Sequence, residues 1–371
     1  MAVKPGYKKT EFGGIPEDWD VSTFSDLFDI TAGADFDPKR SHSFQSSIHP
    51  FPIYSNALTS SGLYGYCSYS DHPANSITVT ARGMVGKANF RNHPYTAIGR
   101  VLVLMPKCEM AGFYFAQVIN NSVKFANEST GVPQLTAPQI SKYRLPVPPP
   151  HEQRAIATAL SDVDALIGAL ERLLAKKRDL KQAAVQQLLT GQIRLPGFHS
   201  EWEMKRIGDI APLQRGFDLP NPSLRPGPYP VVYSNGVMNY HAQAQVQGPG
   251  VITGRSGTIG SVTFVDGPFW PHNTALWVTS FKGNDPRYVF YLYTEINFER
   301  FATGSGVPTL NRNDVHSFEV EIPPYPEQIA IAAVLSDMDA ELAALEQRLT
   351  KTRSLKQGVM QELLTGKTRL L

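Results

Sequence analysis

The feature that most constrains this 371-residue chain is a 48-residue segment that occurs twice. Residues 148–195 and 323–370 align without a gap, and 28 of the 48 positions are identical, which indicates an internal duplication. Both copies open with prolines followed by Glu-Gln, and both close with Leu-Leu-Thr-Gly at Gly191 and Gly366. A proline-led, acidic first turn and a glycine after the last turn are typical of helix ends. Each copy therefore predicts one helix of about 40 residues, or about 60 Å.

The apolar residues of both copies recur in alternating steps of four and three. They are Ile156, Leu160, Val163, Ile167, Leu170 and Leu174 in the first copy, and Ile331, Leu335, Met338, Leu342, Leu345 and Leu349 in the second. This is the spacing of a coiled-coil seam, and it predicts that the two helices pair with each other. Two independent core helices are the alternative interpretation.

Polar residues interrupt the seam at the same place in both copies, at Lys177 and Thr352. The shared interruption predicts a mid-helix stutter. After it, the apolar positions resume near Leu180, Ala184 and Leu188 in the first copy, and near Leu355, Val359 and Leu363 in the second.

Chain connectivity predicts the direction of pairing. Only about ten residues separate the first helix from Trp202, so the second globular segment begins near the C-terminal end of that helix. The compact solution is an antiparallel pair with one globular domain at each end. The predicted segments are domain 1 over residues 1–147, helix 1 over 148–191, domain 2 over 192–322 and helix 2 over 323–371.

The two globular segments share landmarks, although their overall sequences differ. The matching stretches are Asp18-Trp19 with Glu201-Trp202, Tyr54-Ser55-Asn56 with Tyr233-Ser234-Asn235, Gly83-Met-Val-Gly86 with Gly257-Thr-Ile-Gly260, and Gly131-Val-Pro133-Gln-Leu135 with Gly306-Val-Pro308-Thr-Leu310. Short β-branched runs between Gly, Pro and Asn predict strands and turns, and hence mixed α/β (α+β) domains. Constant helices would fix a distance, and the divergent domains would recognise two different things.

This order of parts resembles the specificity subunit of type I restriction–modification enzymes. The resemblance covers essentially the whole chain and rests on the paired Pro-Pro-x-x-Glu-Gln openings, the paired Leu-Leu-Thr-Gly closings and the GVPQL and GVPTL stretches. It implies two target recognition domains, each reading one half of a bipartite, asymmetric site in double-stranded DNA. It also implies an antiparallel coiled coil that sets the unread spacer and docks two methyltransferase subunits.

The same resemblance implies that the chain is a non-catalytic subunit of a methyltransferase and restriction endonuclease complex. S-adenosylmethionine, ATP and Mg would bind its methyltransferase and restriction partners. The sequence contains no G-x-x-x-x-G-K-[ST] loop and no metal-ligand spacing, and Ile322 precedes Pro323-Pro324-Tyr325 where an amino-methyltransferase needs a polar residue. The two cysteines could form at most one bridge, which favours a reducing cytoplasm, and the lack of a long apolar run argues against a membrane span.

Net charge is only +2, so DNA binding must depend on the local placement of basic residues. Domain 1 contains 13 Lys plus Arg against 11 Asp plus Glu, and residues 196–322 contain 9 against 11. The candidates for DNA contact are Lys39, Arg40, Arg82, Lys87 and Arg91 in domain 1, Arg215, Arg225, Arg255 and Arg312 in domain 2, and the side chains of Tyr54, Asn56, Tyr233 and Asn235. Arg82 and Arg255 are favoured because each lies in an equivalent glycine hairpin.

Each candidate also has a purely structural interpretation. The arginines could be solvated or form internal salt bridges, and Lys39-Arg40 could lie in a solvated polar loop. The two Tyr-Ser-Asn stretches could be a repeated turn, since identical residues do not explain different half-sites. For the whole chain, the alternative function is a protein-binding adaptor with two heads on a helical rod.

Overall fold

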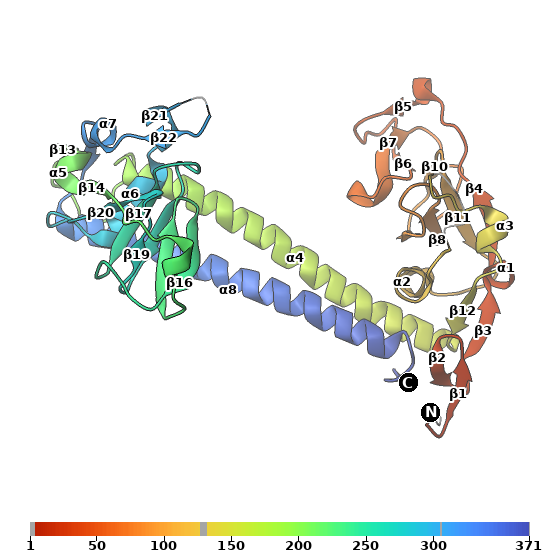
Figure 1. The fold of residues 1–371 in the computed structure, drawn as a ribbon. Helices are drawn as coiled ribbons and strands as arrows, with labels where there is room; N and C mark the ends of the chain where they lie inside the picture. The colour runs from red at the N-terminus through yellow and green to blue at the C-terminus, as the bar shows by residue number, and fades with distance from the viewer. Residues whose placement is uncertain (1–3, 127–131, 305, 371) are drawn as a thin grey trace. The chain divides into compact units, whose positions relative to one another are not determined.

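The computed structural model describes residues 4–126, 132–304 and 306–370, and the chain divides into two compact units. Unit 1 consists of Met1–Ala169 together with Leu349–Leu371, and unit 2 is Leu170–Arg348. Two long helices, α4 (Pro150–Leu189) and α8 (Tyr325–Leu363), contribute one end each to both units (Figure 1). Each unit therefore combines a globular domain with a short stretch of both helices.

Domain 1 is the part of unit 1 that precedes α4. Its strands are β1 (Tyr7–Thr10), β2 (Gly13–Pro16), β3 (Asp20–Thr23), β4 (Phe28–Ala32), β5 (Ser41–His42), β6 (Phe51–Tyr54), β7 (Leu63–Cys67), β8 (Ser76–Thr80), β9 (Ala88–Arg91), β10 (Thr96–Ala97), β11 (Val101–Pro106) and β12 (Arg144–Val147). Its helices are α1 (Phe24–Leu27), α2 (Gly112–Ser122) and α3 (Ala137–Ile140), with 3-10 turns η1 (Pro38–Arg40) and η2 (Thr59–Gly62).

Domain 2 lies between α4 and α8 in the chain. Its strands are β13 (Glu203–Arg206), β14 (Leu213–Arg215), β15 (Tyr229–Tyr233), β16 (Gly236–His241), β17 (Gly250–Gly254), β18 (Val262–Val265), β19 (Trp270–Pro271), β20 (Ala275–Val278), β21 (Ala302–Thr303), β22 (Thr309–Leu310) and β23 (Glu319–Ile322). Its helices are α5 (Ile207–Ile210), α6 (Pro286–Glu295) and α7 (Arg312–His316), with 3-10 turns η3 (Asn221–Ser223) and η4 (Phe298–Phe301).

The two domains share one topology. An antiparallel sheet has the order β4-β11-β8-β9 in domain 1 and β14-β20-β17-β18 in domain 2. A second sheet contains the parallel pair β6-β10 in domain 1 and β15-β19 in domain 2. The strand before each long helix pairs with a strand near the start of its domain, β12 with β3 and β23 with β13. The weak sequence landmarks therefore mark a real structural repeat, and the α+β prediction is confirmed.

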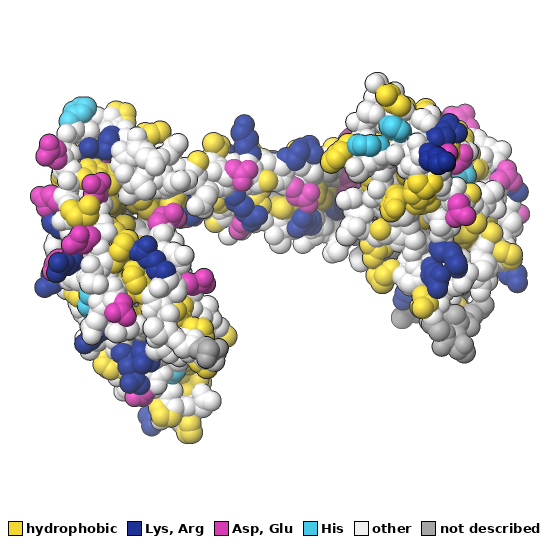
Figure 2. Space-filling model, turned by 90° about the horizontal axis from the view of Figure 1, so that it is seen from above, with side chains coloured by type: hydrophobic (Ala, Val, Ile, Leu, Met, Phe, Trp, Pro, Cys, Tyr) yellow, Lys and Arg dark blue, Asp and Glu magenta, His cyan; other side chains and the backbone are white. Residues whose placement is uncertain are grey.

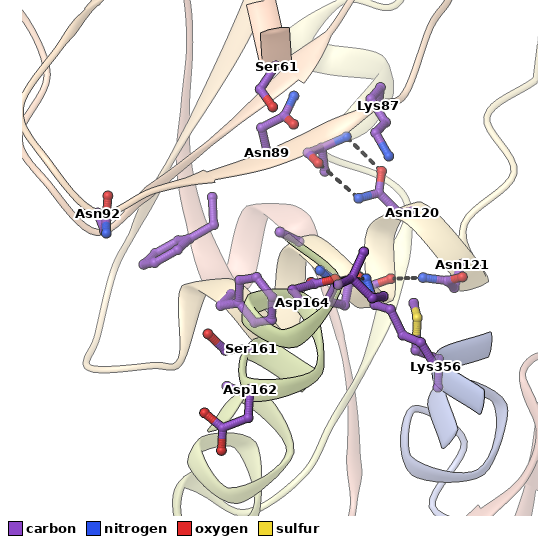
Figure 3. A pocket seen from close by; sticks show the side chains of 18 of the residues that line it. Ser61, Lys87, Asn89, Asn92, Asn120, Asn121, Ser161, Asp162, Asp164 and Lys356 are labelled. Atoms are coloured by element: carbon purple, nitrogen blue, oxygen red, sulfur yellow. Dashed lines mark hydrogen bonds and ion pairs between the residues drawn. The ribbon is translucent and has the colours of Figure 1, made fainter. Parts of the chain in front are cut away.

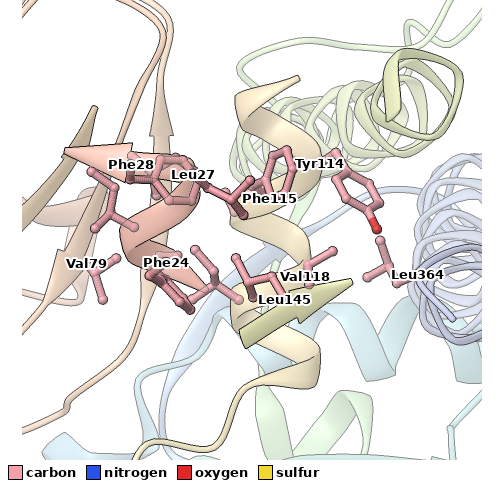
Figure 4. Close-up of a cluster of buried hydrophobic side chains, with 14 of the residues drawn as sticks. Phe24, Leu27, Phe28, Val79, Tyr114, Phe115, Val118, Leu145 and Leu364 are labelled. Atoms are coloured by element: carbon pink, nitrogen blue, oxygen red, sulfur yellow. The ribbon is translucent and has the colours of Figure 1, made fainter. Parts of the chain in front are cut away.

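Each domain shares a hydrophobic core with its ends of the long helices. In domain 1, β8 has the β-branched, apolar run Ser-Ile-Thr-Val-Thr and is buried on both faces. Its core, with α1 and α2 packed together in Figure 4, continues onto the helices through Ile156 and Leu160 of α4 and Met360 and Leu363 of α8. In unit 2 the corresponding residues are Val185, Leu188, Ile331 and Leu335. Burial of this apolar surface fixes each domain to its helix ends.

The helices pair antiparallel within each unit, as the connectivity predicts. In unit 1, Asp164 of α4 pairs with Lys356 of α8. In unit 2, Lys177 and Lys181 of α4 pair with Glu341 and Asp339 of α8, so residue numbers fall along α8 as they rise along α4. All twelve predicted seam residues, from Ile156 to Leu174 and from Ile331 to Leu349, are buried or half-buried.

The predicted stutter after Lys177 and Thr352 is wrong. Leu180 and Leu355 are 47% and 61% exposed, and Lys181 and Lys356 occupy the inner face instead. Steps of three and four therefore continue through Lys177, Lys181, Ala184 and Leu188, without a break in the heptad. Lysine tolerates this position because its aliphatic stem packs along the seam while its ammonium group reaches a carboxylate on the other helix.

Candidate nucleic-acid interface

A buried glutamate joins domain 1 to both helix ends. Glu152, in the first turn of α4, has 0% exposure and accepts a hydrogen bond from the indole of Trp19 (Nε1–Oε2, 2.9 Å). Arg369, in the tail beyond α8, donates to the two Glu152 oxygens from Nε at 2.6 Å and Nη2 at 2.8 Å. Hydrogen bonds with Glu152 and Asp18 raise the pKa of Arg369 further above its ordinary value, and the bond to Arg369 lowers the pKa of Asp18. We call Trp19, Glu152 and Arg369 joint 1.

The same arrangement closes unit 2, with equivalent residues. Glu327, in the first turn of α8, is 1% exposed and accepts from Arg194 Nε and Nη2, both at 2.6 Å. Trp202 donates from its indole to Glu327 at 3.2 Å. We call Trp202, Glu327 and Arg194 joint 2. Each joint links a domain, the first turn of the helix that follows it, and the tail of the other helix.

The glutamine of each Glu-Gln pair fixes the helix to its domain in a second way. Gln153 accepts from the backbone N–H of Ala111 at the start of α2 and donates to the Pro148 carbonyl at 2.9 Å. Gln328 makes the equivalent bonds with the backbone N–H of Asp285, before α6, and with the Pro323 carbonyl. The repeated Pro-Pro-x-x-Glu-Gln opening is therefore a domain-to-helix connection, beyond its role as a helix start.

Three of the recognition candidates of domain 1, Asn56, Arg82 and Lys87, meet at the glycine loop between β8 and β9. Asn56 binds the backbone of this loop, with its Oδ1 accepting from the N–H of Ala81 at 2.6 Å and its Nδ2 donating to the Arg82 carbonyl. The loop also pairs with the GVPQL stretch, since Gly83 N–H donates to the Pro133 carbonyl at 2.9 Å. Gly131 of that stretch lies outside the described residues. Arg82 and Lys87 are exposed, and Asn56 holds the loop backbone at Ala81 and Arg82.

Two domain 1 candidates are core residues, which corrects their placement on the DNA-contacting surface. Arg91 is 3% exposed, donates to Thr78 Oγ1 at 3.0 Å, and stacks on the ring of Tyr54 with its guanidinium carbon 3.4 Å from the centroid. Burial lowers the pKa of Arg91 and raises the pKa of Tyr54. Tyr54 is also buried and bonds His93 through its hydroxyl at 2.9 Å. Both side chains support the fold beneath the glycine loop.

Domain 2 brings two candidate arginines into one polar network. Arg215 Nη2 donates to Asp218 Oδ1 at 3.1 Å, and Asn273 Nδ2 donates to the same oxygen. The Arg255 guanidinium donates to the Asn273 carbonyl at 3.3 Å. Bonding to Asn273, with a contribution from Arg215, lowers the pKa of Asp218. We call Arg215, Asp218, Arg255 and Asn273 the domain 2 cluster.

Aromatic and amide candidates of domain 2 lie beside this network without copying domain 1. Tyr233 packs on His272, with 4.2 Å between ring centroids, and accepts from Asn239 Nδ2 at 3.2 Å. Asn235 is exposed and its Nδ2 lies 3.6 Å from Met238 Sδ, so it does not clamp a loop as Asn56 does. The repeated Tyr-Ser-Asn sequence thus ends an equivalent strand in each domain, but it leads into different turns and its side chains have different roles.

The remaining candidates are exposed and lie away from the glycine loops in the chain. Lys39 and Arg40 form η1, and Arg40 donates to Ser68 Oγ at 3.2 Å and stacks on Tyr69. Arg225 lies after η3, and Arg312 is the first residue of α7. Figure 2 shows Lys and Arg in small groups on the domains, and cationic and anionic side chains interspersed along the helices.

The backbone pairing shows that Arg82 and Arg255 are not at equivalent positions but are offset by one residue. Arg82 bridges to Gln134 as Ser256 bridges to Thr309, so Arg82 corresponds to Ser256. Arg255 corresponds to Ala81, because their N–H groups bond the carbonyls of Thr274 and Arg100 respectively. Arg100 is exposed, and sequence comparison missed it because the β10–β11 turn carries no shared landmark. The two domains therefore present different side chains from the same backbone positions.

Comparison with known proteins identifies this scaffold. A family model described as the type I restriction modification DNA specificity domain matches residues 16–177 and again 199–353. The chain belongs to this family. The proposed MjaX type I restriction enzyme specificity subunit of Methanocaldococcus jannaschii is 22% identical over 98% of this chain and 97% of that protein. The MjaVIII specificity subunit from the same organism is 20% identical over 70% of each chain.

A solved structure supports the fold over the full chain. The crystal structure of a type I restriction–modification S subunit from M. genitalium covers 98% of both chains with a TM-score of 0.70 at 14% identity. The two domains of the present protein are therefore the paired target recognition domains of a type I specificity subunit. Over the described ranges, no helix is long and apolar enough to span a membrane, and no His, Cys, Asp and Glu side chains gather into a possible metal site.

One large groove adjoins the first recognition domain within unit 1. It has a volume of about 1110 Å³ and lies between β9, α2 and the paired ends of α4 and α8 (Figure 3). Lys87 lines it together with Asn89, Asn120, Asp162 and Lys356. Asn120 bonds both the N–H and the carbonyl of Ala88 at 2.9 Å, which covers the open edge of β9.

Proposed function

We propose that this specificity subunit reads a bipartite, asymmetric site in double-stranded DNA, with one half-site assigned to each recognition domain. The observation that carries the proposal is the use of one backbone framework for different side chains. At three equivalent positions domain 1 has Ala81, Arg82 and Arg100, whereas domain 2 has Arg255, Ser256 and Thr274. Reading different base sequences requires different donors at the same place, and arginine is the side chain that best recognises guanine.

The domain 2 cluster offers two kinds of contact to a duplex. Arg215 and Arg255 can donate to base edges or phosphates, and Asp218 holds Arg215 in one orientation. The Asp218 carboxylate can also accept from a cytosine amino group. In domain 1, Arg82, Lys87 and Arg100 are exposed cations. Domain 2 has fewer basic than acidic residues, so such clustering is what permits it to bind DNA.

We propose that the helix pair sets the unread spacer between the half-sites. Inserting one heptad into both α4 and α8 adds about 10.5 Å at 1.5 Å per residue. At about 3.4 Å per base pair this corresponds to about three additional base pairs. Mapping modified bases in cells that express the variant with its methyltransferase should show unchanged half-sites and a longer spacer. A changed half-site would contradict the role of the helices as a ruler.

We propose further that the chain is the non-catalytic member of its complex and works in the cytoplasm. Two methyltransferase subunits would dock on the helix pair and bind S-adenosylmethionine, and a restriction subunit would bind ATP and Mg. The described residues of this chain contain no cluster that could hold a metal ion. Its own contribution is to bind, orient and space the DNA.

Modularity provides the test that separates this proposal from a protein-binding adaptor. Replacing residues 196–322 by the equivalent domain of another specificity subunit should change one half-site and leave the other unchanged. Arg255→Ala should weaken or relax only the half-site read by domain 2, by about 1–3 kcal/mol. Arg82→Ala should do the same for the other half. An adaptor would show no sequence-specific, salt-dependent affinity for duplex DNA.

A further inference from the structure

The two joints contain a pattern that stability alone does not explain. Glu152 and Glu327 are 0% and 1% exposed, and each meets one arginine and one tryptophan in the same arrangement. A buried ion pair is often no more stabilising than well-packed apolar residues, because both charges lose their hydration. Such pairs do contribute directional geometry, which apolar packing does not.

Each joint is built to fix an angle. In joint 1 the two nitrogens of the Arg369 fork bind the two oxygens of Glu152 at 2.6 and 2.8 Å, and the Trp19 indole adds a third donor at 2.9 Å. The planar fork and the indole together define both the position and the rotation of the carboxylate. Because the three side chains come from the domain, the first turn of α4 and the tail beyond α8, the joint resists rocking of the domain on its helix ends.

We propose that joints 1 and 2 are positioning sites that fix the angle of each recognition domain on its helix ends, and so determine how strictly the enzyme selects the spacer length. This inference rests on the proposed function. The helices supply a distance, but a domain that rocks on their ends could reach its half-site across a range of distances. One additional base pair moves a half-site by about 3.4 Å and rotates it by about 35°, so small changes of angle are enough to admit it.

The test uses the specificity subunit in complex with its methyltransferase. Glu152→Gln keeps the size of the side chain and an acceptor for Trp19, but removes the charge that binds both guanidinium nitrogens. Arg369→Lys keeps the charge and removes the fork. Modified-base mapping of the wild type first defines both half-sites. Initial methylation rates are then measured on duplexes with the native spacer and with spacers one base pair shorter or longer.

Both variants should methylate the off-length duplexes relatively faster, lowering the preference for the native spacer about tenfold, equivalent to about 1.4 kcal/mol. The half-site sequences should not change. Glu327→Gln in joint 2 should have the same effect through the other domain. The matched control is Glu109→Gln, which neutralises an exposed glutamate whose partner Arg154 is 3.9 Å away, and it should leave the preference unchanged.

A merely structural role predicts a different result. If rates on all spacers fall in parallel, or if the spacer preference stays constant while the unfolding temperature falls, the positioning role is overturned and the proposed function stands. If the wild-type complex shows no methylation at any bipartite site, the proposed function fails and this inference fails with it. The inference is also overturned if Arg369→Lys and Glu152→Gln each keep full activity and the wild-type preference for the native spacer.

Discussion

Removing the arginine of joint 1 should destabilise unit 1 specifically. Glu152 is 0% exposed, and Arg369→Met would leave it with the indole of Trp19 as its one side-chain donor among the described residues. Breaking a buried ion pair by removing one partner costs about 3–5 kcal/mol, because the remaining charge is uncompensated. Loss of the pair between Arg369 and the half-exposed Asp18 adds less than about 1 kcal/mol.

This cost corresponds to a fall of about 10 °C in the unfolding temperature of unit 1, since 1 kcal/mol shifts a domain of this size by about 2–4 °C. Calorimetry measures the temperature, and segment-resolved hydrogen exchange shows where the structure opens. Exchange should rise in domain 1 and in the ends of α4 and α8 that belong to unit 1. Arg194→Met, the equivalent change in joint 2, should produce the same pattern in unit 2.

Two variants make the interpretation strict. Arg154, like Glu152, lies in α4, and Arg154→Met breaks an exposed pair with Glu109 of the β11–α2 loop. This change should alter stability by less than about 0.5 kcal/mol. The double variant Glu152→Gln with Arg369→Met should be more stable than Arg369→Met by at least about 1 kcal/mol, because no buried charge remains. The reasoning is refuted if Arg369→Met unfolds within about 0.5 kcal/mol of the wild type, or if exchange rises equally in both units.

Three further predictions concern the seam, the glycine loop and pH. Leu174→Ala should cost about 2–4 kcal/mol and Leu180→Ala less than about 0.5 kcal/mol in chemical unfolding, since one side chain is buried and the other exposed. Arg91→Met should lower the stability of unit 1, whereas Arg82→Ala should leave it unchanged and reduce DNA affinity in titrations. Burial lowers the pKa of His316, whose neutral ring accepts a backbone N–H at 2.8 Å. Below about pH 6.5 the unfolded chain therefore binds more protons at His316 than the folded chain does. The free energy of unfolding should fall as the pH drops from about 6.5 toward the lower pKa of the folded state, and it should fall less steeply in His316→Gln.

The sequence predicted the helices well because their periodicity has a simple physical cause. Heptad spacing from Ile156 and from Ile331 identified the buried seam, and connectivity predicted the antiparallel direction. The error after Lys177 arose from treating lysine as incompatible with an inner position. Hydrophobicity alone cannot decide which of the neighbouring residues Leu180 and Lys181 lies on the inner face. Lys181 can lie there because Asp339 on the other helix pairs with its ammonium group.

The structural placement of the candidate residues was predictable only in part. The glycine loops were located correctly, because glycine is required where the backbone has positive φ, as at Gly83 and Gly257. Exposure of individual side chains was not visible, so Arg91 was assigned to the surface although it is core. Its neighbours Tyr54 and Thr78 reach it from other strands, and such contacts depend on tertiary packing.

The joints can be recognised in the sequence only when the two helical copies are considered together. Glu152 and Glu327 are equivalent in the duplication, and so are Arg194 and Arg369. In an antiparallel pair the start of each helix lies beside the tail of the other, so each glutamate meets the arginine of the opposite copy. Residues that are identical in both copies at opposite helix ends are therefore candidates for contact with each other.

The same geometry explains why the duplication kept its helices and changed its domains. Every joint and every lysine pair of the seam joins one copy to the other, as Glu152 to Arg369 and Asp164 to Lys356. A substitution in one copy breaks a contact made by the second copy, so the two copies cannot diverge independently there. The exposed positions of the glycine loops bind no helix residue among those described, and a change such as arginine to serine leaves the backbone pairing intact. Exposed positions of the loops such as Arg82 and Ser256 can therefore diverge without loss of the contacts that join the two copies.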